Sequence, residues 1–313
     1  MTRTFISLLG TLATTLIASS AFATNSAELY TGASYQYGRF EARVRFAAGD
    51  GVVSSFFLWK DGSERSGTFW NELDFEKLGA DCHLETNAFF GNPGAVHIQR
   101  HTELKTLCSD FHTYTYEWTP DYIAWFVDGT ELRRETGATA DAYAENATAG
   151  MQIRFNIWPG DASFGGNFSP SILPVYQQID WVEYSSYADG AFTVEWRDDF
   201  DTDQLDSRWL TGSWASPKNL STHDSRNVTL EDGNAVLGLT ADPVGGTGGT
   251  SSQGGSGGTS AGVPSTPSCG GGGDGCSTAP GRPSGTRALL AVLGLAGFFV
   301  FGRRRARIHR DRA

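Results

Sequence analysis

The sequence predicts an all-β fold, a sandwich or a barrel built from many short strands. Between Leu29 and about Ala241, short strand-like runs follow one another with turn residues between them. The chain has 12% aromatic residues, 39 glycines and only two methionines, which favours an aromatic-rich β protein over a helical bundle. The clearest strand candidates are YGRFEARVRF, VVSSFFLW, ELDFEKL, HLETNAFF, HTYTYEW, YIAWFVDG, MQIRFNIW and QIDWVEY.

The turns and the helix content support the same class of fold. The run that ends in Phe126-Val127 is followed by Asp128-Gly129, a dipeptide typical of a tight hairpin turn. The only plausible helical piece is short and lies near residues 141–146. Because strands at this spacing lack crossover helices, βαβ units are not expected.

The charge of the chain limits its partners. The net charge is −11, and a separate basic cluster at the C-terminus leaves the folded part still more acidic. Nucleic acid and an anionic membrane surface are therefore not expected partners of the folded part.

The first residues are typical of an export signal, predicted to span residues 1–23. Arg3 precedes an apolar run, and Ala21-Phe22-Ala23 offers a small-x-small cleavage site. The apolar run is too short for a comfortable membrane span. Export permits disulfide bonds, and we expect Cys82 and Cys108 to pair, with two buried thiols as the alternative.

The C-terminal part of the chain is predicted to be a linker, a membrane segment and a basic tail. Residues 242–287 are rich in Gly, Ser and Thr, so they cannot bury enough apolar surface to fold. Residues 288–302 are apolar and residues 303–313 are basic, which favours a short transmembrane segment with a cytoplasmic tail over a buried soluble helix. This layout resembles the surface-sorting tails of myxobacterial proteins, which implies a processing role for Cys276.

The stretch FWNELDFEKLG contains three carboxylates at alternate positions, Glu72, Asp74 and Glu76. On a strand these side chains share one face, whereas Leu73 and Phe75 share the other. One interpretation is the solvated polar face of an edge strand. The other is a glycoside-hydrolase site: the two Glu Cα atoms would lie about 13 Å apart. Side chains that lean inward then bring the carboxyls within roughly 5–6 Å, as retention of configuration requires.

ELDFE followed by LG resembles the ExDxE signature of glycoside hydrolase family 16, and further segments from about Ala27 to Tyr184 resemble the family in the family's order. The resemblance implies a concanavalin-like β-jelly-roll sandwich of two antiparallel sheets. It also implies that Glu72 is the nucleophile, Asp74 the assisting acid and Glu76 the general acid/base. The uninterrupted spacing resembles the branch that cleaves mixed-linkage β-glucans.

The order of the segments resembles the circularly permuted members of that branch. Residues 192–240 resemble strands that most members carry before the catalytic half, but here they follow it. The resemblance therefore implies one β-jelly-roll domain over residues 24–241, with residues 190–241 completing the sandwich. A separate small domain is the alternative, although about fifty residues would form a poor core.

The resemblance also implies a set of substrate-binding side chains and a metal site. Aromatic faces and polar side chains would bind the sugar, and these candidates are Phe57, Trp59, Glu85, Asn87, Arg154, Asn156, Trp158 and Trp214. Glu85 replaces a Gln of the nearest relatives, and Trp59 replaces a Tyr. A structural Ca²⁺ would be held by the Asp180 side chain and by the backbone of Asp199 and Gly233. No cofactor is expected for catalysis.

Taken together, the sequence predicts an exported, surface-tethered endo-β-glucanase that hydrolyses mixed β-1,3-1,4-glucan with retention. A laminarin-type β-1,3-glucanase and a β-glucan transglycosylase are alternatives within the fold. A sugar-binding module without catalysis is the alternative from a different class. By resemblance we expect a monomer.

Overall fold

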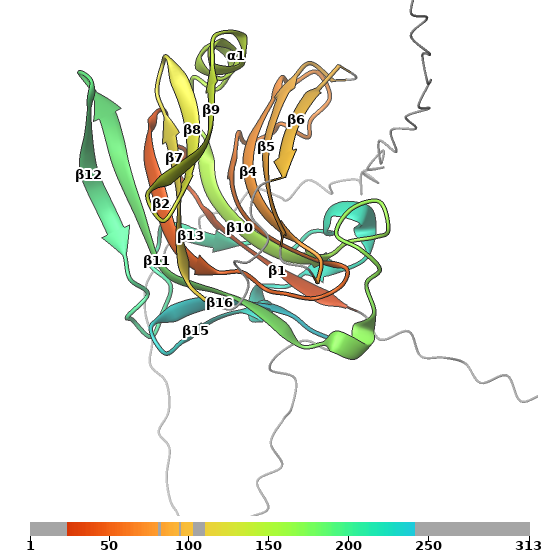
Figure 1. The fold of residues 1–313 in the computed structure, drawn as a ribbon. Helices are drawn as coiled ribbons and strands as arrows, with labels where there is room; N and C mark the ends of the chain where they lie inside the picture. The colour runs from red at the N-terminus through yellow and green to blue at the C-terminus, as the bar shows by residue number, and fades with distance from the viewer. Residues whose placement is uncertain (1–23, 81–82, 94, 103–109, 242–313) are drawn as a thin grey trace, which may run out of the picture. The chain divides into compact units, whose positions relative to one another are not determined.

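The computed structural model describes residues 24–80, 83–93, 95–102 and 110–241. Within these residues, two eight-stranded sheets pack face to face (Figure 1). Neighbouring strands are antiparallel except for the short parallel pair of β1 and β14. This arrangement confirms the predicted all-β sandwich of two antiparallel sheets.

The first sheet carries its strands in the order β13-β1-β10-β3-β4-β5-β6, with β14 beside β1. Figure 1 shows that its long strands bend, so that the concave side of the sheet faces away from the second sheet. The strands are β1 (Asn25–Thr31), β3 (Val52–Trp59), β4 (Trp70–Leu78), β5 (His83–Gly91), β6 (His97–Thr102), β10 (Gln152–Pro159), β13 (Trp209–Thr211) and β14 (Thr222–His223).

The second sheet has the order β15-β16-β11-β2-β7-β8-β9, with β12 beside β11. Its strands are β2 (Gly38–Arg45), β7 (His112–Trp118), β8 (Tyr122–Val127), β9 (Thr130–Thr136), β11 (Val175–Ala188), β12 (Ala191–Asp198), β15 (Val228–Glu231) and β16 (Asn234–Leu239). Three single turns of 3-10 helix lie in the connections that the structure describes, at Pro170–Ile172, Pro217–Asn219 and Ser225–Asn227.

Aromatic rings fill the space between the sheets. Phe56 of β3 stacks on Phe155 of β10, with ring centroids 4.8 Å apart, and meets the edge of Tyr116 from β7. Because side chains alternate along a strand, each inner face contributes every second residue to this core. Lys77 is fully buried among these inner-face residues, and its Nζ donates a hydrogen bond to the carbonyl of Gly79.

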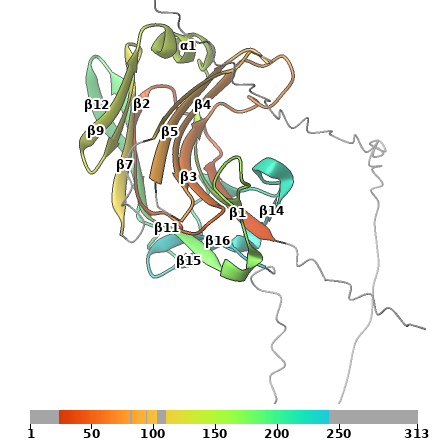
Figure 2. The same ribbon diagram turned by 45° about the vertical axis from the view of Figure 1, so that its right-hand side comes forward.

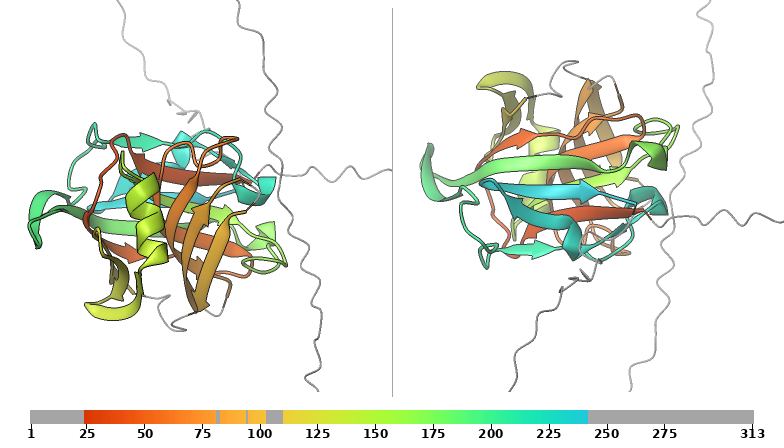
Figure 3. Two further views of the ribbon diagram at one scale, coloured as in Figure 1. Left: turned by 90° about the horizontal axis from the view of Figure 1, so that it is seen from above. Right: turned by 90° about the horizontal axis from the view of Figure 1, so that it is seen from below.

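The predicted hairpin and helix are both present. Asp128 and Gly129 connect β8 to β9 with φ angles of 49° and 75°, the left-handed pair that a tight two-residue turn requires. The described residues contain one α-helix, α1 (Ala138–Asn146), at the position where the sequence predicts a helical piece. It contacts β9 and β5 and so covers one end of both sheets (Figure 3, left).

The last strands of the described chain belong to the same two sheets. β12 and β16 pair with β11, and β13 and β14 pair with β1. The two ends of the described chain meet: the amides of Asn25 and Thr240 each donate to the carbonyl of the other residue, at 2.9 Å. A chain with adjacent ends can be joined there and opened elsewhere at little cost.

Several predictions concern residues outside the described ranges. These are the export signal 1–23, the Cys82–Cys108 pair, the linker 242–287, the segment 288–302, the tail 303–313 and Cys276. Across the described ranges, every helix is too short or too polar to cross a membrane.

We expect a rearranged chain to fold. It would begin at Ala191, run to Thr240, continue through a short glycine linker into Asn25 and end at Ala188. Since the opened Asp189-Gly190 turn is exposed and the joined ends are already paired, the free energy of unfolding should stay within about 2 kcal/mol of the original. Denaturant unfolding measures it. A chain opened between Leu73 and Asp74 is the control that should not fold, and failure of both chains would contradict the prediction.

Candidate active site

The three acids of β4 lie on the outer, concave side of the first sheet. Leu73 and Phe75 are fully buried in the core, so Glu72, Asp74 and Glu76 point the opposite way. β4 pairs with β3 on one side and β5 on the other, so it is a central strand. The edge-strand interpretation of the acidic pattern is therefore wrong.

The strand register places the predicted sugar-binding residues around these acids. Directly paired residues of neighbouring strands share a face. Glu72 pairs with Trp59 of β3, Asp74 with Phe57 of β3 and Asn87 of β5, and Glu76 with Glu85 of β5. One strand further, β10 pairs with β3 and adds three residues of the same face: Arg154, Asn156 and Trp158. Figure 2 shows β3, β4 and β5 side by side.

Trp214 reaches this face from the loop after β13. Its Nε1 donates to Glu28 Oε2 at 3.1 Å, and its ring lies 5.6 Å from that of Tyr30 on β1. The side chain is 41% exposed, so it can offer a ring face to a sugar. Trp158 is only 4% exposed and lies against Phe164, with centroids 6.0 Å apart. The platform role predicted for Trp158 therefore fits the partly exposed Phe164 better.

A buried polar network behind Trp214 was not predicted from the sequence. Glu28 Oε1 accepts from Arg154 at 2.7 Å, and His223 Nε2 lies 3.4 Å from Glu28 Oε2. Burial raises the pKa of Glu28, although Arg154 acts against this, and burial together with Arg154 lowers the pKa of His223 to about 4. The feature of the sequence that could have indicated this network is Glu28, a single acid inside the strand-like run AELY.

The same network contains a serine–histidine–glutamate arrangement. Ser26 Oγ lies 3.0 Å from His223 Nδ1, on the opposite side of the ring from Glu28. A nucleophilic serine must reach its substrate. Ser26, Glu28 and His223 are all at most 3% exposed, so this arrangement holds the loop of Trp214 in place and is not a hydrolase triad.

Hydrogen bonds orient both glutamates of β4. Trp70 Nε1 donates to Glu72 Oε2 at 2.8 Å, and Asn87 Nδ2 donates to Glu76 Oε2 at 2.5 Å. Burial raises the pKa of Glu72 to about 7, against the Trp70 hydrogen bond, the charge of Arg154 and a hydrogen bond with Asp74. Trp70 was missed from the sequence, yet it continues the same alternate positions towards the start of the strand.

Side chains from beyond the sheet hold the backbone of β4. The hydroxyl of Tyr143 on α1 donates to the carbonyl of Glu72 at 2.6 Å. The hydroxyl of Tyr116 on β7 is shared between the carbonyls of Phe56 and Leu73, at 2.8 and 3.2 Å. Trp125 Nε1 on β8 donates to the carbonyl of Asp74 at 3.2 Å. Three consecutive peptide groups of the acidic strand are thereby fixed from the core side.

Comparison with known proteins identifies the family. The model of "Glycosyl hydrolases family 16" matches residues 9–197 of the 313. The chain belongs to glycoside hydrolase family 16. A β-glucanase of Fibrobacter succinogenes is 39% identical over 227 residues, which cover 69% of this chain and 64% of the relative. A β-glucanase of Brevibacillus brevis is 35% identical over 163 residues, which cover 50% and 59%.

The chain thus spans less than two thirds of the length of these curated relatives. Among solved structures, the Bacillus licheniformis β-glucanase has a TM-score of 0.42, with 25% identity over 53% of this chain and 78% of that one.

In this family 16 domain, a pocket of about 430 Å³ opens at the Glu76 end of the acidic face. Glu85 lies directly opposite Glu76 and contributes to the pocket together with Phe164 and His83, whose Nε2 lies 3.6 Å from Glu85 Oε1. Glu85 thus places a second carboxyl group beside Glu76, where a glutamine would place a neutral amide.

Two of the residues expected to hold calcium have side chains that pair with arginines. The Asp180 carboxylate accepts a hydrogen bond from Arg43, and the Asp199 carboxylate accepts one from Arg197 at 2.7 Å. The described residues contain no group of three or more His, Cys, Asp or Glu side chains that could hold a metal ion. Each pairing engages one carboxylate oxygen, and calcium ligation by the Asp180 side chain and by the backbone carbonyls of Asp199 and Gly233 stays a prediction.

Replacing Trp70 with Phe should move the acidic limb of the activity profile. The substitution removes a hydrogen bond that stabilises the ionised Glu72, so the pKa of Glu72 rises further. If Glu72 is the nucleophile expected from the sequence, it must be ionised to attack, and the fall of kcat/KM on the acidic side should begin about one pH unit higher. Trp59→Phe is the control, because that ring packs edge-on against Trp70 without bonding to Glu72. An acidic limb that stays in place in Trp70→Phe would contradict this assignment.

Proposed function

We propose that this family 16 protein is a retaining endo-β-glucanase that hydrolyses mixed-linkage β-1,3-1,4-glucan. The observation that carries the proposal is the shared face of Glu72, Asp74 and Glu76 on a central strand, surrounded by aromatic and amide side chains. The β-glucanase names of the relatives agree with the substrate class. The complete set of oriented carboxylates argues against a sugar-binding module without catalysis.

The proposed reaction is a double displacement. Glu76 as acid protonates the oxygen of the scissile bond while the Glu72 carboxylate attacks the anomeric carbon, so the leaving chain departs and a glycosyl-enzyme forms. Glu76, now a carboxylate, takes a proton from water, which displaces Glu72 from the sugar. Asn87 holds Glu76, and Trp70 holds Glu72, in the orientations that these two steps need.

Because burial raises the pKa of Glu72, this residue retains its proton more readily than an exposed glutamate does. Asp74 is 3% exposed and lies between the two glutamates, hydrogen-bonded to Glu72. A proton that moves from Glu72 to Asp74 leaves Glu72 ionised and lets Asp74 donate to it, so the buried pair needs only one negative charge. This is the assisting role that we propose for Asp74.

We further propose that the domain is a circular permutation of the usual family order, exported and tethered to the cell surface. The match to the Fibrobacter relative covers more of this chain than the match to the Brevibacillus relative does, 69% against 50%. The adjacent ends at Asn25 and Thr240 supply the physical basis for a permutation. Export and tethering rest on the composition of residues 1–23 and 242–313.

The test is product analysis on a panel of lichenan, laminarin and xyloglucan. We expect rapid depolymerisation of lichenan with retained anomeric configuration. Glu72→Gln should lower kcat by about 10³-fold or more while the protein still folds. Faster turnover of laminarin would support the β-1,3-glucanase alternative, and products longer than the substrate would support a transglycosylase. If lichenan is not cleaved, the proposed substrate is wrong.

We propose that a structural calcium ion binds through the Asp180 side chain and the backbone carbonyls of Asp199 and Gly233. Calcium at a hundredfold excess over its dissociation constant should stabilise the protein by about 2.7 kcal/mol, and EDTA should reverse the effect. Since Asp180→Asn removes the negative charge of an expected ligand, this variant should lose most of the rise in Tm with calcium. A rise that persists unchanged in this variant would exclude Asp180 as a ligand, and no rise in either protein would contradict the calcium site.

A further inference from the structure

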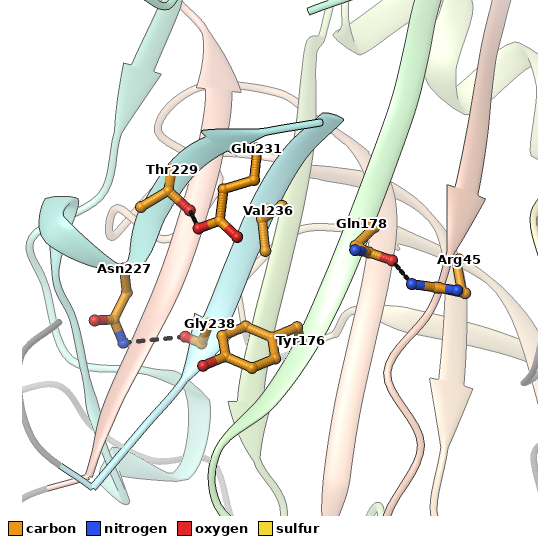
Figure 4. Close-up of a pocket in the computed structure, with 8 residues that line it drawn as sticks. All are labelled: Arg45, Tyr176, Gln178, Asn227, Thr229, Glu231, Val236 and Gly238. Carbon is orange, nitrogen blue, oxygen red and sulfur yellow. Dashed lines mark hydrogen bonds between the residues drawn. The ribbon is translucent and has the colours of Figure 1, made fainter. Parts of the chain in front are cut away.

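A second pocket lies on the opposite side of the sandwich from the acids. It has a volume of about 300 Å³ and opens on the outer face of the second sheet, across β2, β11, β16 and β15. Sites for small ligands typically occupy about 300–1,000 Å³. Figure 4 shows the eight lining residues: Arg45, Tyr176, Gln178, Asn227, Thr229, Glu231, Val236 and Gly238.

The shape of this pocket comes from a cross-strand pair of an aromatic residue and a glycine. Tyr176 of β11 pairs directly with Gly238 of β16, and the Tyr176 side chain is 48% exposed. Figure 4 shows the ring beside Gly238, so no side chain rises from the neighbouring strand at this position. A glycine inside a strand weakens it, and often marks a place where a ligand approaches the backbone.

The groups around the ring suit a neutral polyhydroxylated ligand. On one side, Arg45 donates a hydrogen bond to Gln178, and on the other, Thr229 donates to Glu231 at 2.7 Å (Figure 4). The lining contains one cationic side chain, Arg45, and one anionic side chain, Glu231, so the pocket favours neither an anionic nor a cationic ligand. Amide, carboxylate and guanidinium groups near an aromatic face are the groups that bind sugar hydroxyls while the ring covers the apolar face of a pyranose.

We propose that this pocket, here called the Tyr176 pocket, is a second binding site for a β-glucan chain. The identity of the polysaccharide in this proposal rests on the proposed function. The Tyr176 pocket and the acidic face lie on opposite sheets. The pocket would therefore hold one part of the polymer while a distant part of the same polymer occupies the acidic face. Such a site increases the local concentration of polymer at the enzyme and leaves short substrates unaffected.

The test measures binding separately from turnover. In the full-length Glu72→Gln protein, retention on an insoluble mixed-linkage β-glucan should weaken about five- to tenfold when Tyr176 is replaced with Ala. In the active protein, Tyr176→Ala should leave kcat/KM on a short soluble oligosaccharide unchanged. Tyr187→Ala is the matched control, since this tyrosine lies on the same strand outside the pocket and packs against Phe192.

A second variant fills the pocket without removing the ring. An added Cβ on Gly238 would meet the Tyr176 ring at 3.5 Å and Thr240 at 3.4 Å, which are ordinary contacts, so Gly238→Ala should fold. It should weaken retention in the same direction as Tyr176→Ala. Thermal unfolding of both variants identifies any loss that comes from misfolding.

The outcomes distinguish the two proposals. If soluble lichenan is cleaved but Tyr176→Ala and Gly238→Ala are retained as strongly as the Tyr187→Ala control, the Tyr176 pocket does not bind glucan. If lichenan is not cleaved but retention depends on Tyr176, the pocket stands and the proposed reaction is wrong.

Discussion

The candidate active site depends on one constraint, the position of β4 in the middle of the first sheet. The backbone of this central strand forms hydrogen bonds with a neighbouring strand on each edge. One of its faces is buried in the core, where Leu73 and Phe75 are fully buried. The other face is then free to carry Glu72, Asp74 and Glu76 at a fixed spacing. Rigid strands position side chains more accurately than loops do, so the distance between the two glutamates is set by the pleat of the sheet.

This arrangement brings three acids close together, and the surrounding residues limit the repulsion. Trp70 and Asn87 donate hydrogen bonds to the two glutamates, and Arg154 supplies a positive charge nearby. Arg154 is itself held by the buried Glu28, which also bonds to Trp214. One network therefore connects the charge balance of the acids to the aromatic ring best placed to bind a sugar.

Side chains of the second sheet and of α1 hold the backbone of β4 in the first sheet. Tyr116 and Trp125 cross the core to bond the backbone of β4, and Tyr143 does so from α1. A buried hydroxyl or indole N–H needs an acceptor, and the carbonyls of the acidic strand supply it. The strands after residue 190 complete both sheets, so the site and the C-terminal part of the domain depend on the same core.

The sequence by itself determined the all-β class, the hairpin at Asp128-Gly129 and the shared face of the three acids, because these follow from local periodicity and turn chemistry. It could not show that β4 is central, since strand order depends on pairing between distant segments. The buried roles of Glu28 and His223, 195 residues apart, were likewise decided by the tertiary structure alone. So was the burial of Trp158 under Phe164, because exposure depends on which loop covers a ring and not on the residue's place along its strand.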